Sequence, residues 1–174
     1  MSKSIHWLKQ AIESAQKPTI TLLIGAPGSG KSTWMRENAV GLTIVSSDDI
    51  LEAWASEQGT TYAELWQTRF RDAEKQMKAD LAAALTRGEH IIVDRTNMSV
   101  KVRRKMLANV PKTYVKFAAV FQCERSELIR RVVERTERTG RVLGNEGFTH
   151  VDVIDRMLDM YQEPTEEEFD AIFI

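Results

Sequence analysis

The chain has 174 residues, of which 43% are hydrophobic and 28% charged, and its net charge is −1. This length predicts a single domain over 1–174, with a core large enough to fold without disulfides or structural metal ions. A near-neutral chain lacks an overall positive field, so contact with a nucleic acid would need a local basic patch. The single cysteine, Cys123, excludes a disulfide framework, and no run approaches the roughly 18 apolar residues of a membrane span. We therefore expect a soluble cytoplasmic protein with no membrane partner.

The N-terminal segment 1–17 carries apolar residues at helical spacing over 4–16, which predicts a short amphipathic helix appended to the domain. Residues 19–24 are apolar and β-branched, and they predict a buried strand. A glycine-rich stretch follows, and residues 34–39 are expected to continue as a helix. A strand, a loop and a helix in this order are the setting in which phosphate-binding loops occur.

The glycine-rich stretch Gly25-Ala26-Pro27-Gly28-Ser29-Gly30-Lys31-Ser32-Thr33 matches the phosphate-loop pattern G-x-x-x-x-G-K-[ST]. Its glycines let successive backbone N–H groups point inward, and the helix behind them adds its positive end. Lys31 would reach the β- and γ-phosphates of a nucleotide triphosphate, and the Ser32 hydroxyl would bind Mg²⁺. The alternative is a glycine-rich turn that matches by chance. The residues predicted to bind the nucleotide are Gly25, Pro27, Gly28, Ser29, Gly30, Lys31, Ser32 and Thr33.

Two further polar clusters follow apolar runs. A strand over 42–45 ends in Ser46-Ser47-Asp48-Asp49, and a strand over 91–93 ends in Asp94-Arg95-Thr96-Asn97. Open α/β sheets place their ligand sites beyond the carboxyl ends of the strands, so both clusters should lie beside the phosphate loop. An acidic residue that closes a buried strand looks like the second nucleotide-binding element of phosphate-loop proteins. We therefore expect Asp94 to act on Mg²⁺ or its waters.

A helix over 49–56 and a long helix that ends near Gly88 are expected between these strands. The spacing of Thr61 and Glu64 is that of a capping box, which marks the start of the long helix. Six residues recur at intervals of three and four, and this stripe is interpreted as buried core rather than as a substrate platform. Trp54 and Tyr62 fall outside the stripe and could line a pocket. The stripe consists of Trp66, Phe70, Ala73, Met77, Leu81 and Ala84.

The second half of the chain alternates helices and strands. Ser99 opens a basic helix that includes Arg103 and Arg104, a strand spans 114–121, Thr149 caps a further helix, and a last strand lies within 169–174. Between them, a helix that begins at Ser126 carries a stripe of arginines. Four strands and a fifth within 169–174, separated by helices, predict a three-layer α/β fold with a parallel sheet.

The arginine stripe consists of Arg131, Arg135 and Arg138, at i, i+4 and i+7 of that helix. The ordinary explanation is a solvated surface held by Glu127–Arg131 and Glu134–Arg138 pairs, worth about 0.2–0.5 kcal/mol each. The glycines of 139–147 indicate a flexible stretch behind the helix, as a moving lid requires. Together with a phosphate loop, this pattern favours arginines that bind phosphate, because guanidinium groups suit the charge of a transferring phosphoryl group.

The phosphate loop, Ser47-Asp48-Asp49, Asp94-Arg95-Thr96-Asn97 and the arginine helix occur in an order and at distances that resemble the 5′-hydroxyl polynucleotide kinase family. The resemblance covers about 19–161, and the sequence is also similar to zeta-toxin-like and small-metabolite phosphate-loop kinases. It implies an adenylate-kinase-like strand order of 2-3-1-4-5 and a helical, arginine-bearing lid over about 124–148. It also implies ATP and Mg²⁺ as cofactors and a role in nucleic acid end repair.

By this resemblance, Lys31 and Ser32 hold the ATP phosphates and Mg²⁺, and Arg131 and Arg135 are the lid arginines on the donor. Asp48 accepts the proton of the attacking hydroxyl, which agrees with the general chemistry of a carboxylate placed beside a bound hydroxyl. Asp49 is the alternative for this role, although a position at the start of a helix also gives it a structural use.

Two departures from the family pattern concern the acceptor. Leu51 stands where the family often has an arginine that grips the acceptor phosphate, and Arg95 separates Asp94 from Thr96-Asn97. Either Arg95 or the basic cluster 101–105 could replace the grip, or the acceptor has no phosphate there. The candidate acceptor-binding residues are Asp49, Arg95, Thr96, Asn97, Arg103 and Arg104.

Three hypotheses remain open. The leading one is an ATP-dependent kinase whose partner is the 5′-hydroxyl end of RNA or DNA. The second is a kinase for a small acceptor such as a nucleoside, nucleotide-sugar or sugar acid. The third is a nucleotide-dependent regulatory module. A GTPase is disfavoured because no N-K-x-D tetrapeptide occurs, and the chain is short for a motor or remodelling ATPase. The sequence gives no prediction of the oligomeric state.

Overall fold

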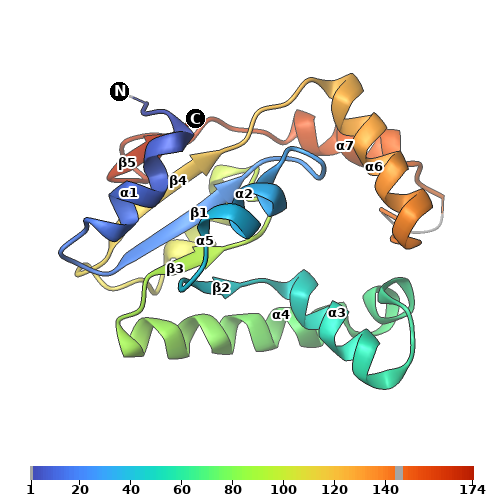
Figure 1. Cartoon of the computed structure of the whole chain (residues 1–174), viewed down its shortest axis with the longest axis horizontal. Helices are drawn as coiled ribbons and strands as arrows, with labels where there is room; N and C mark the ends of the chain where they lie inside the picture. Colours follow the sequence, from blue (N-terminus) through green and yellow to red (C-terminus); the bar gives the residue numbers. More distant parts are fainter. Residues whose placement is uncertain (1, 144–146) are drawn as a thin grey trace.

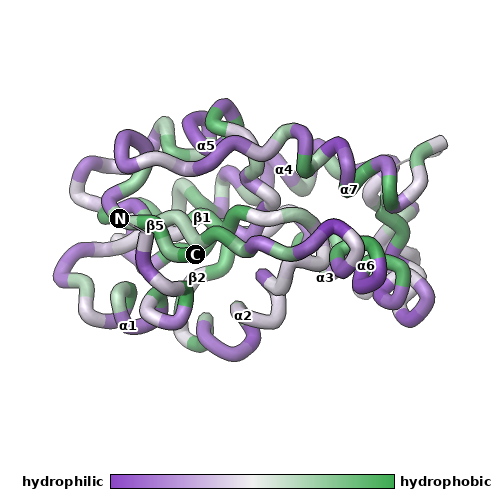
Figure 2. The backbone as a smooth tube through the Cα atoms, turned by 90° about the horizontal axis from the view of Figure 1, so that it is seen from above, coloured by the Kyte–Doolittle hydropathy of each residue, from purple (hydrophilic) through white to green (hydrophobic). Residues whose placement is uncertain are grey.

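The computed structural model describes residues 2–143 and 147–174, and it contains a parallel sheet in the order β2-β3-β1-β4-β5 with helices on both faces (Figures 1 and 2). The fold class and the strand order predicted from the sequence are both confirmed. Part of the expected flexible stretch, residues 144–146, lies outside the described residues. The strands are β1 (Thr19–Ile24), β2 (Thr43–Val45), β3 (Ile91–Val93), β4 (Val115–Val120) and β5 (Ala171–Phe173).

Three α-helices begin at the capping residues that the sequence predicts. Thr61 and Glu64 form the predicted capping box, and Ser99 and Thr149 accept backbone N–H bonds at the starts of the next capped helices. The N-terminal segment is a 3₁₀ turn, η1 (Ile5–Trp7), that leads into a short α-helix rather than one continuous helix. The α-helices are α1 (Leu8–Glu13), α2 (Lys31–Asn38), α3 (Ser47–Gln58), α4 (Tyr62–Arg87), α5 (Val100–Leu107), α6 (Arg125–Thr139) and α7 (His150–Asp159).

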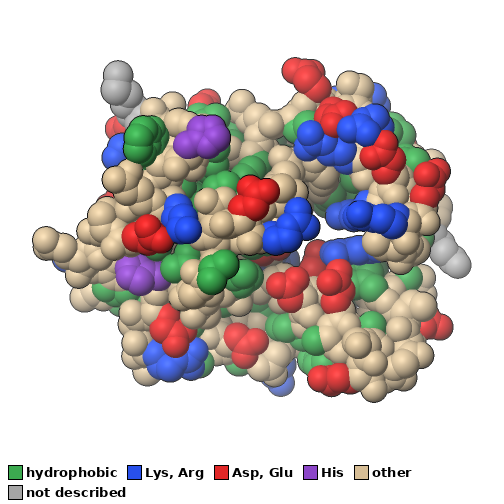
Figure 3. Space-filling model, in the orientation of Figure 1, with side chains coloured by type: hydrophobic (Ala, Val, Ile, Leu, Met, Phe, Trp, Pro, Cys, Tyr) green, Lys and Arg blue, Asp and Glu red, His purple; other side chains and the backbone are tan. Residues whose placement is uncertain are grey.

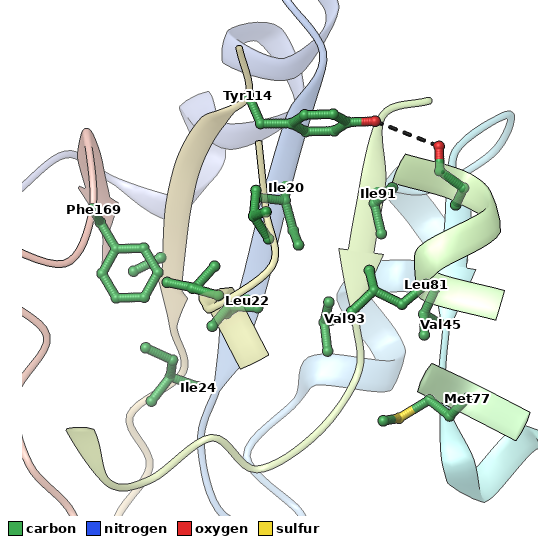
Figure 4. Close-up of a cluster of buried hydrophobic side chains, with 14 of the residues drawn as sticks. Ile20, Leu22, Ile24, Val45, Met77, Leu81, Ile91, Val93, Tyr114 and Phe169 are labelled. Atoms are coloured by element: carbon green, nitrogen blue, oxygen red, sulfur yellow. Dashed lines mark hydrogen bonds between the residues drawn. The ribbon is translucent and has the colours of Figure 1, made fainter. Parts of the chain in front are cut away.

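The core lies on both faces of β1, all six residues of which are buried. Alternate side chains of a strand point to opposite faces. Ile20, Leu22 and Ile24 therefore pack with α4 and α5 (Figure 4), and Leu23 packs with α1 on the other face. A central strand buried on both faces explains the continuous apolar run in the sequence.

The start of the chain is held against the last strand. The backbone N–H of Lys3 donates to the carbonyl of Ile172 at 2.8 Å, and that of Ile174 donates to the carbonyl of Lys3 at 2.8 Å. A single parallel bridge thus extends the sheet beyond β5, and no sequence pattern predicted it. No helix in the described ranges is long and apolar enough to cross a bilayer.

Helices project beyond the carboxyl edge of the sheet on two sides. In Figure 1, α3 and the N-terminal end of α4 lie below this edge, while the rest of α4 runs back under the sheet, and α6 and α7 lie above the edge. The helices that connect β2 to β3 and those that connect β4 to β5 thus form opposite walls around the predicted phosphate loop.

Arg103 was expected on the acceptor side, and this placement is wrong. Its side chain is fully buried and forms a salt bridge with Glu168, with Nη2 and Oε2 separated by 2.9 Å. Its Nη1 also donates to the carbonyls of Asn97, Met98 and Gln162. Arg103 therefore ties α5 to the segment before β5, because a buried guanidinium needs a partner for each donor.

Replacing Arg103 with Met should lower the free energy of unfolding by about 3–5 kcal/mol, because Glu168 would stay buried without a counter-charge. Urea unfolding of the Arg103→Met and Arg104→Met variants provides the comparison, since Arg104 is exposed on the same helix. Arg104→Met should change stability by less than about 0.5 kcal/mol. Equal effects of the two substitutions would contradict a structural role for Arg103.

Candidate active site

A cleft of about 1220 Å³ lies at the carboxyl edge of the sheet, between the α3–α4 wall and the α6–α7 wall. Figure 3 shows it as a hollow in which basic side chains face acidic ones. Of the predicted site residues, those that line the cleft are Pro27, Gly28, Ser29, Gly30, Lys31, Ser32, Thr33, Asp48, Asp49, Asp94, Arg95, Thr96, Arg131 and Arg135. Gly25, Asn97, Arg103 and Arg104 are not among the lining residues.

The phosphate loop folds tightly at its first glycine. A Cβ at Gly25 would lie 2.6 Å from Ser29 Oγ and 2.8 Å from the carbonyl oxygen of Phe121, so no larger residue fits. The Gly25 N–H donates to the carbonyl of Thr96 at 3.0 Å, which joins the loop to the chain beyond β3. At the far end, Gly30 caps α2 with φ of 104°, a conformation that glycine adopts without strain.

Lys31 is buried at the base of this loop. Its Nζ donates to the carbonyls of Gly25 and Ala26 at 2.7 and 3.0 Å. Burial lowers the pKa of Lys31 to about 8, against the opposing effect of the Asp94 carboxylate. The ammonium group therefore sits among acceptors that phosphate oxygens could replace, since a buried charge needs such partners.

Helix α6 packs directly onto the phosphate loop. A Cβ at Gly28, where φ is 85°, would lie 3.1 Å from the carbonyl oxygen of Leu128 and 3.5 Å from the Cβ of Arg131. The absence of a side chain at position 28 thus allows α6 to approach. This approach carries the arginine stripe to the mouth of the loop.

The stripe arginines that line the cleft differ in their partners. Arg131 binds Glu127 at 2.6 Å, as the surface explanation expected, but it also donates to the carbonyl of Gly28 at 3.1 Å. Glu134 binds Arg130 instead of forming the expected pair with Arg138. Arg135 is half-buried, its Nε lacks a hydrogen-bond partner, and burial followed by the nearby Arg141 lowers its pKa. A buried guanidinium with an unsatisfied donor suits an anionic ligand.

The first turn of α3 presents the two adjacent aspartates. Ser46 caps this helix by accepting the N–H of Asp49 at 3.2 Å. Both carboxylates line the cleft. Burial, and then the neighbouring Asp48, raise the pKa of Asp49.

Asp48 is held by two residues from other elements. Tyr62 Oη donates to Asp48 Oδ1 at 3.0 Å, and Arg141 Nη2 donates to Asp48 Oδ2 at 2.5 Å. Arg141 also binds Glu52, and its guanidinium lies 4.2 Å from the centre of the Tyr62 ring. Burial and the Asp48 charge raise the pKa of Tyr62, which keeps its hydroxyl as a donor. Arg141 therefore connects the segment after α6 to the opposite wall.

Asp94 faces Lys31 from the end of β3. Burial raises the pKa of Asp94 to about 6, although the Lys31 charge acts in the opposite direction. Asp48 and Asp49 raise it further, which brings three carboxyls and one ammonium into one electrostatic group. A carboxyl in such a group favours the arrival of a cation.

Of the residues after Asp94, Arg95 lines the cleft and Asn97 has a structural role. Asn97 was expected to bind the acceptor, but it is 1% exposed and donates to the carbonyl of Leu23 at 2.8 Å. Its φ of 47° is left-handed, which asparagine tolerates better than most residues. Arg95 lines the cleft and binds Glu74 at 2.6 Å. Arg95 thus remains the basic residue on the acceptor wall, while Asn97 fastens this segment to β1.

Part of the α4 wall was not predicted from the sequence. Trp66 and Phe70 were assigned to the core, yet both are half-buried and line the cleft with Tyr62. Trp54, which could have lined a pocket, packs between α3 and α4 instead, with Arg69 over its ring at 4.6 Å. The spacing of four residues between Trp66 and Phe70 shows that they share one face of α4. It does not show that this part of α4 extends past the edge of the sheet.

The site has features that fit a nucleotide with its metal. The phosphate loop is packed too closely at Gly25 and Gly28 for a side chain, Lys31 lies at its base, and Arg135 offers an unsatisfied donor in the same cleft. Within 2–143 and 147–174, no cluster of three or more histidine, cysteine or acidic residues could hold a metal alone. Mg²⁺ suits this arrangement, because it usually takes one or two protein ligands and completes its shell with phosphate and water.

Comparison with known proteins identifies kinases. A family model described as an AAA domain matches residues 20–164. UMP-CMP kinase 1 of Oryza sativa subsp. japonica is 28% identical over an alignment 176 residues long, gaps included, that covers 92% of this chain and 67% of the rice protein.

Two solved structures share the fold. A chain in the Pnkp1/Rnl/Hen1 RNA repair complex is 25% identical with a TM-score of 0.63, and the match covers 84% of this chain and 45% of that one. A protein from Chloroflexus aurantiacus J-10-fl, described as a kinase, is 17% identical with a TM-score of 0.70, over 91% of this chain and 87% of that one. The 17% likeness shows the fold alone. The family model and the rice kinase support P-loop kinase activity, and the acceptors that the relatives' names suggest differ.

The buried Asp94 carboxyl gives the protein without metal or nucleotide a defined pH dependence. Its pKa of about 6 exceeds the usual 3.8, so the folded state holds this proton more tightly than the unfolded state. Its contribution to stability is therefore present below pH 4 and lost as pH rises through 6. The unfolding free energy of the wild type relative to Asp94→Asn should fall by about 2 kcal/mol between pH 4 and pH 7 in EDTA.

The matched control is Asp155→Asn. Arg125 lowers the pKa of Asp155, so the ionised form is favoured in the folded state. The unfolding free energy of the wild type relative to Asp155→Asn should therefore rise with pH. Urea unfolding at several pH values measures both. A difference between wild type and Asp94→Asn that does not change with pH would show that Asp94 is not desolvated.

Proposed function

The chain belongs to the AAA domain family, and from this premise we propose that it is an ATP-dependent kinase that phosphorylates the 5′-hydroxyl end of RNA or DNA. The observation that carries the proposal is the convergence of Asp48, Lys31 and Arg135 on one cleft at the phosphate loop. A cradle for a donor, a carboxylate for an acceptor and cations for the transferring group are the parts that phosphoryl transfer needs.

ATP fits the donor side. Backbone N–H groups of the loop, Lys31, Arg131 and Arg135 would hold its phosphates. Lys31 and Arg131 can exchange their contacts with loop carbonyls for phosphate oxygens, and Arg135 Nε has no partner to give up. Ser32 and Asp94 would hold Mg²⁺ directly or through water. The metal, when bound, neutralises charge that develops on the phosphate oxygens.

Transfer requires one proton movement and one exchange of bonds. Asp48 orients the acceptor hydroxyl and takes its proton as the hydroxyl oxygen bonds to the γ-phosphorus. The bond from that phosphorus to the bridging β–γ oxygen breaks, and ADP leaves. Each oxygen of Asp48 accepts one hydrogen bond at present, so each retains a further lone pair for the hydroxyl. Arg131 and Arg135 would stabilise the charge on the transferring group.

A nucleic acid acceptor is supported by the family resemblance of the sequence and by the likeness to a chain of an RNA repair complex. A small nucleoside or nucleotide acceptor is the second candidate. Leu51 stands where the family often has an arginine that grips an acceptor phosphate, and its side chain is fully buried, which favours an acceptor without a phosphate at that place. The identity with a UMP-CMP kinase also favours this second candidate.

Asp48→Asn should lower kcat for phosphoryl transfer by about 10²–10⁴-fold, because the amide cannot accept the hydroxyl proton. Its affinity for ATP should remain within about threefold of wild type, as expected for a residue that acts on the acceptor. The measurement is transfer from labelled ATP to 5′-hydroxyl oligonucleotides, nucleosides and sugar acids, with ATP binding followed by calorimetry.

Glu52→Gln is the matched control, because Glu52 lies one turn further along α3, lines the cleft and also binds Arg141. This variant should retain transfer. Full activity of Asp48→Asn, with ATP binding intact, would favour a regulatory module. Transfer to a small acceptor alone would replace the nucleic acid with the second candidate, and weak dependence on salt would agree with it.

A further inference from the structure

One wall of the cleft carries aromatic rings that the phosphate chemistry does not use. Tyr62, Trp66 and Phe70 occupy one side of α4 at intervals of four residues, and all three line the cleft. We call these residues the aromatic face. The ring centres of Trp66 and Phe70 are 4.2 Å apart, and those of Tyr62 and Trp66 are 5.9 Å apart. On its inner side the face packs against Leu51 and Ala55 of α3.

The aromatic face begins at the proposed catalytic carboxylate. Tyr62 donates its hydroxyl hydrogen bond to Asp48 at 3.0 Å, and Arg141 lies over the Tyr62 ring. Tyr62 is therefore already engaged by these two residues. Trp66 and Phe70 continue from it along α4, and eight residues of helix span about 12 Å from 62 to 70. A molecule whose hydroxyl contacts Asp48 would thus extend along Trp66 and Phe70.

The size of the cleft leaves space for a second ligand beside the donor. Its volume of about 1220 Å³ exceeds the roughly 300–1,000 Å³ of pockets that hold one small ligand. Cations gather at the phosphate loop and on α6, where the donor phosphates would bind. The opposite wall combines Asp48, Arg95 and the aromatic face. A planar base would stack on the rings of this wall, whereas a purely polar acceptor has no surface that can do so.

We propose that Trp66 and Phe70 form a base-binding subsite, so that the acceptor carries a nucleobase beside the hydroxyl that is phosphorylated. The inference rests on the proposed kinase function, and it narrows the acceptor to nucleosides, nucleotides and nucleic acid ends. Sugar acids lack the planar ring that this wall would bind. A nucleoside and an oligonucleotide end share the recognised chemistry, and they differ in the phosphates that follow the first sugar.

The test compares removal of the base with removal of the ring that should stack on it. The probes are a 5′-hydroxyl thymidine tetranucleotide labelled at its 3′ end, and the same molecule with an abasic first residue. Binding is measured by fluorescence anisotropy in the presence of ADP, so no transfer is needed. The wild type should bind the abasic probe about tenfold more weakly, as loss of one aromatic stack predicts. In Trp66→Leu, both probes should bind with the weaker affinity.

Trp54→Leu is the matched control, because Trp54 packs in the same α3–α4 cluster but is not among the residues that line the cleft. It should retain the tenfold preference for the intact probe. Trp66→Phe should retain most of it, since the ring can still stack. Unfolding in urea identifies any variant that fails to fold, in which case Phe70→Leu supplies the same comparison.

Equal binding of the two probes by the wild type would overturn the inference, as would a preference that persists in both Trp66→Leu and Phe70→Leu. Absence of binding by the tetranucleotide and by thymidine would overturn it too. Thymidine displacing the probe as well as an unlabelled tetranucleotide would support the subsite with a small acceptor. Because binding is scored without catalysis, failure of transfer would count against the proposed function and leave the subsite supported.

Discussion

Helix α6 lies against the phosphate loop because position 28 has no side chain. The carbonyl of Leu128 occupies space that a Cβ at Gly28 would approach to 3.1 Å, so the loop and the helix that bears the arginines are packed as one unit. Arg131 and Arg135 reach the cleft from this packing, and Arg131 binds the Gly28 carbonyl itself. Gly30 differs, because nothing lies within 4 Å of its Cβ position and its conformation alone requires glycine. A substitution at Gly28 would therefore displace the cations as well as the loop.

Charges in the cleft are paired in ways that a phosphate can replace. Lys31 donates to loop carbonyls, Arg131 binds the loop backbone, and Arg141 holds Asp48 across the cleft. Burial disfavours the charged forms of Lys31, Asp94 and Arg135: it lowers the pKa of Lys31 and of Arg135 and raises the pKa of Asp94. Bringing a triphosphate and a divalent cation into this group would compensate the burial of both signs. The charged side chains of this cleft are therefore arranged to bind an anionic ligand together with a cation.

Much of this arrangement follows from short-range sequence patterns. The strand runs, the capping residues and the phosphate loop are local signals, and parallel topology brings the strand ends to one edge. Arg103 and Asn97 escaped the prediction because their partners, Glu168 and the Leu23 carbonyl, are 65 and 74 residues away in the sequence. Trp66 and Phe70 have the spacing of a buried face, and only the extension of the first turns of α4 past the sheet edge shows that this end meets a cleft. The contact of Arg141 with Asp48 depends on the fold of the whole chain.

The central claim is that the arginines of α6 and the phosphate loop act together on the terminal phosphate of the donor. The most direct measurement is the affinity of wild type and Arg135→Ala for ADP and for a non-hydrolysable ATP analogue, determined by calorimetry with Mg²⁺. The account predicts that the variant loses about tenfold or more in affinity for the ATP analogue and little for ADP, since a charge-assisted hydrogen bond contributes about 1.5–3 kcal/mol. Equal affinities of the variant and the wild type for the ATP analogue would contradict it.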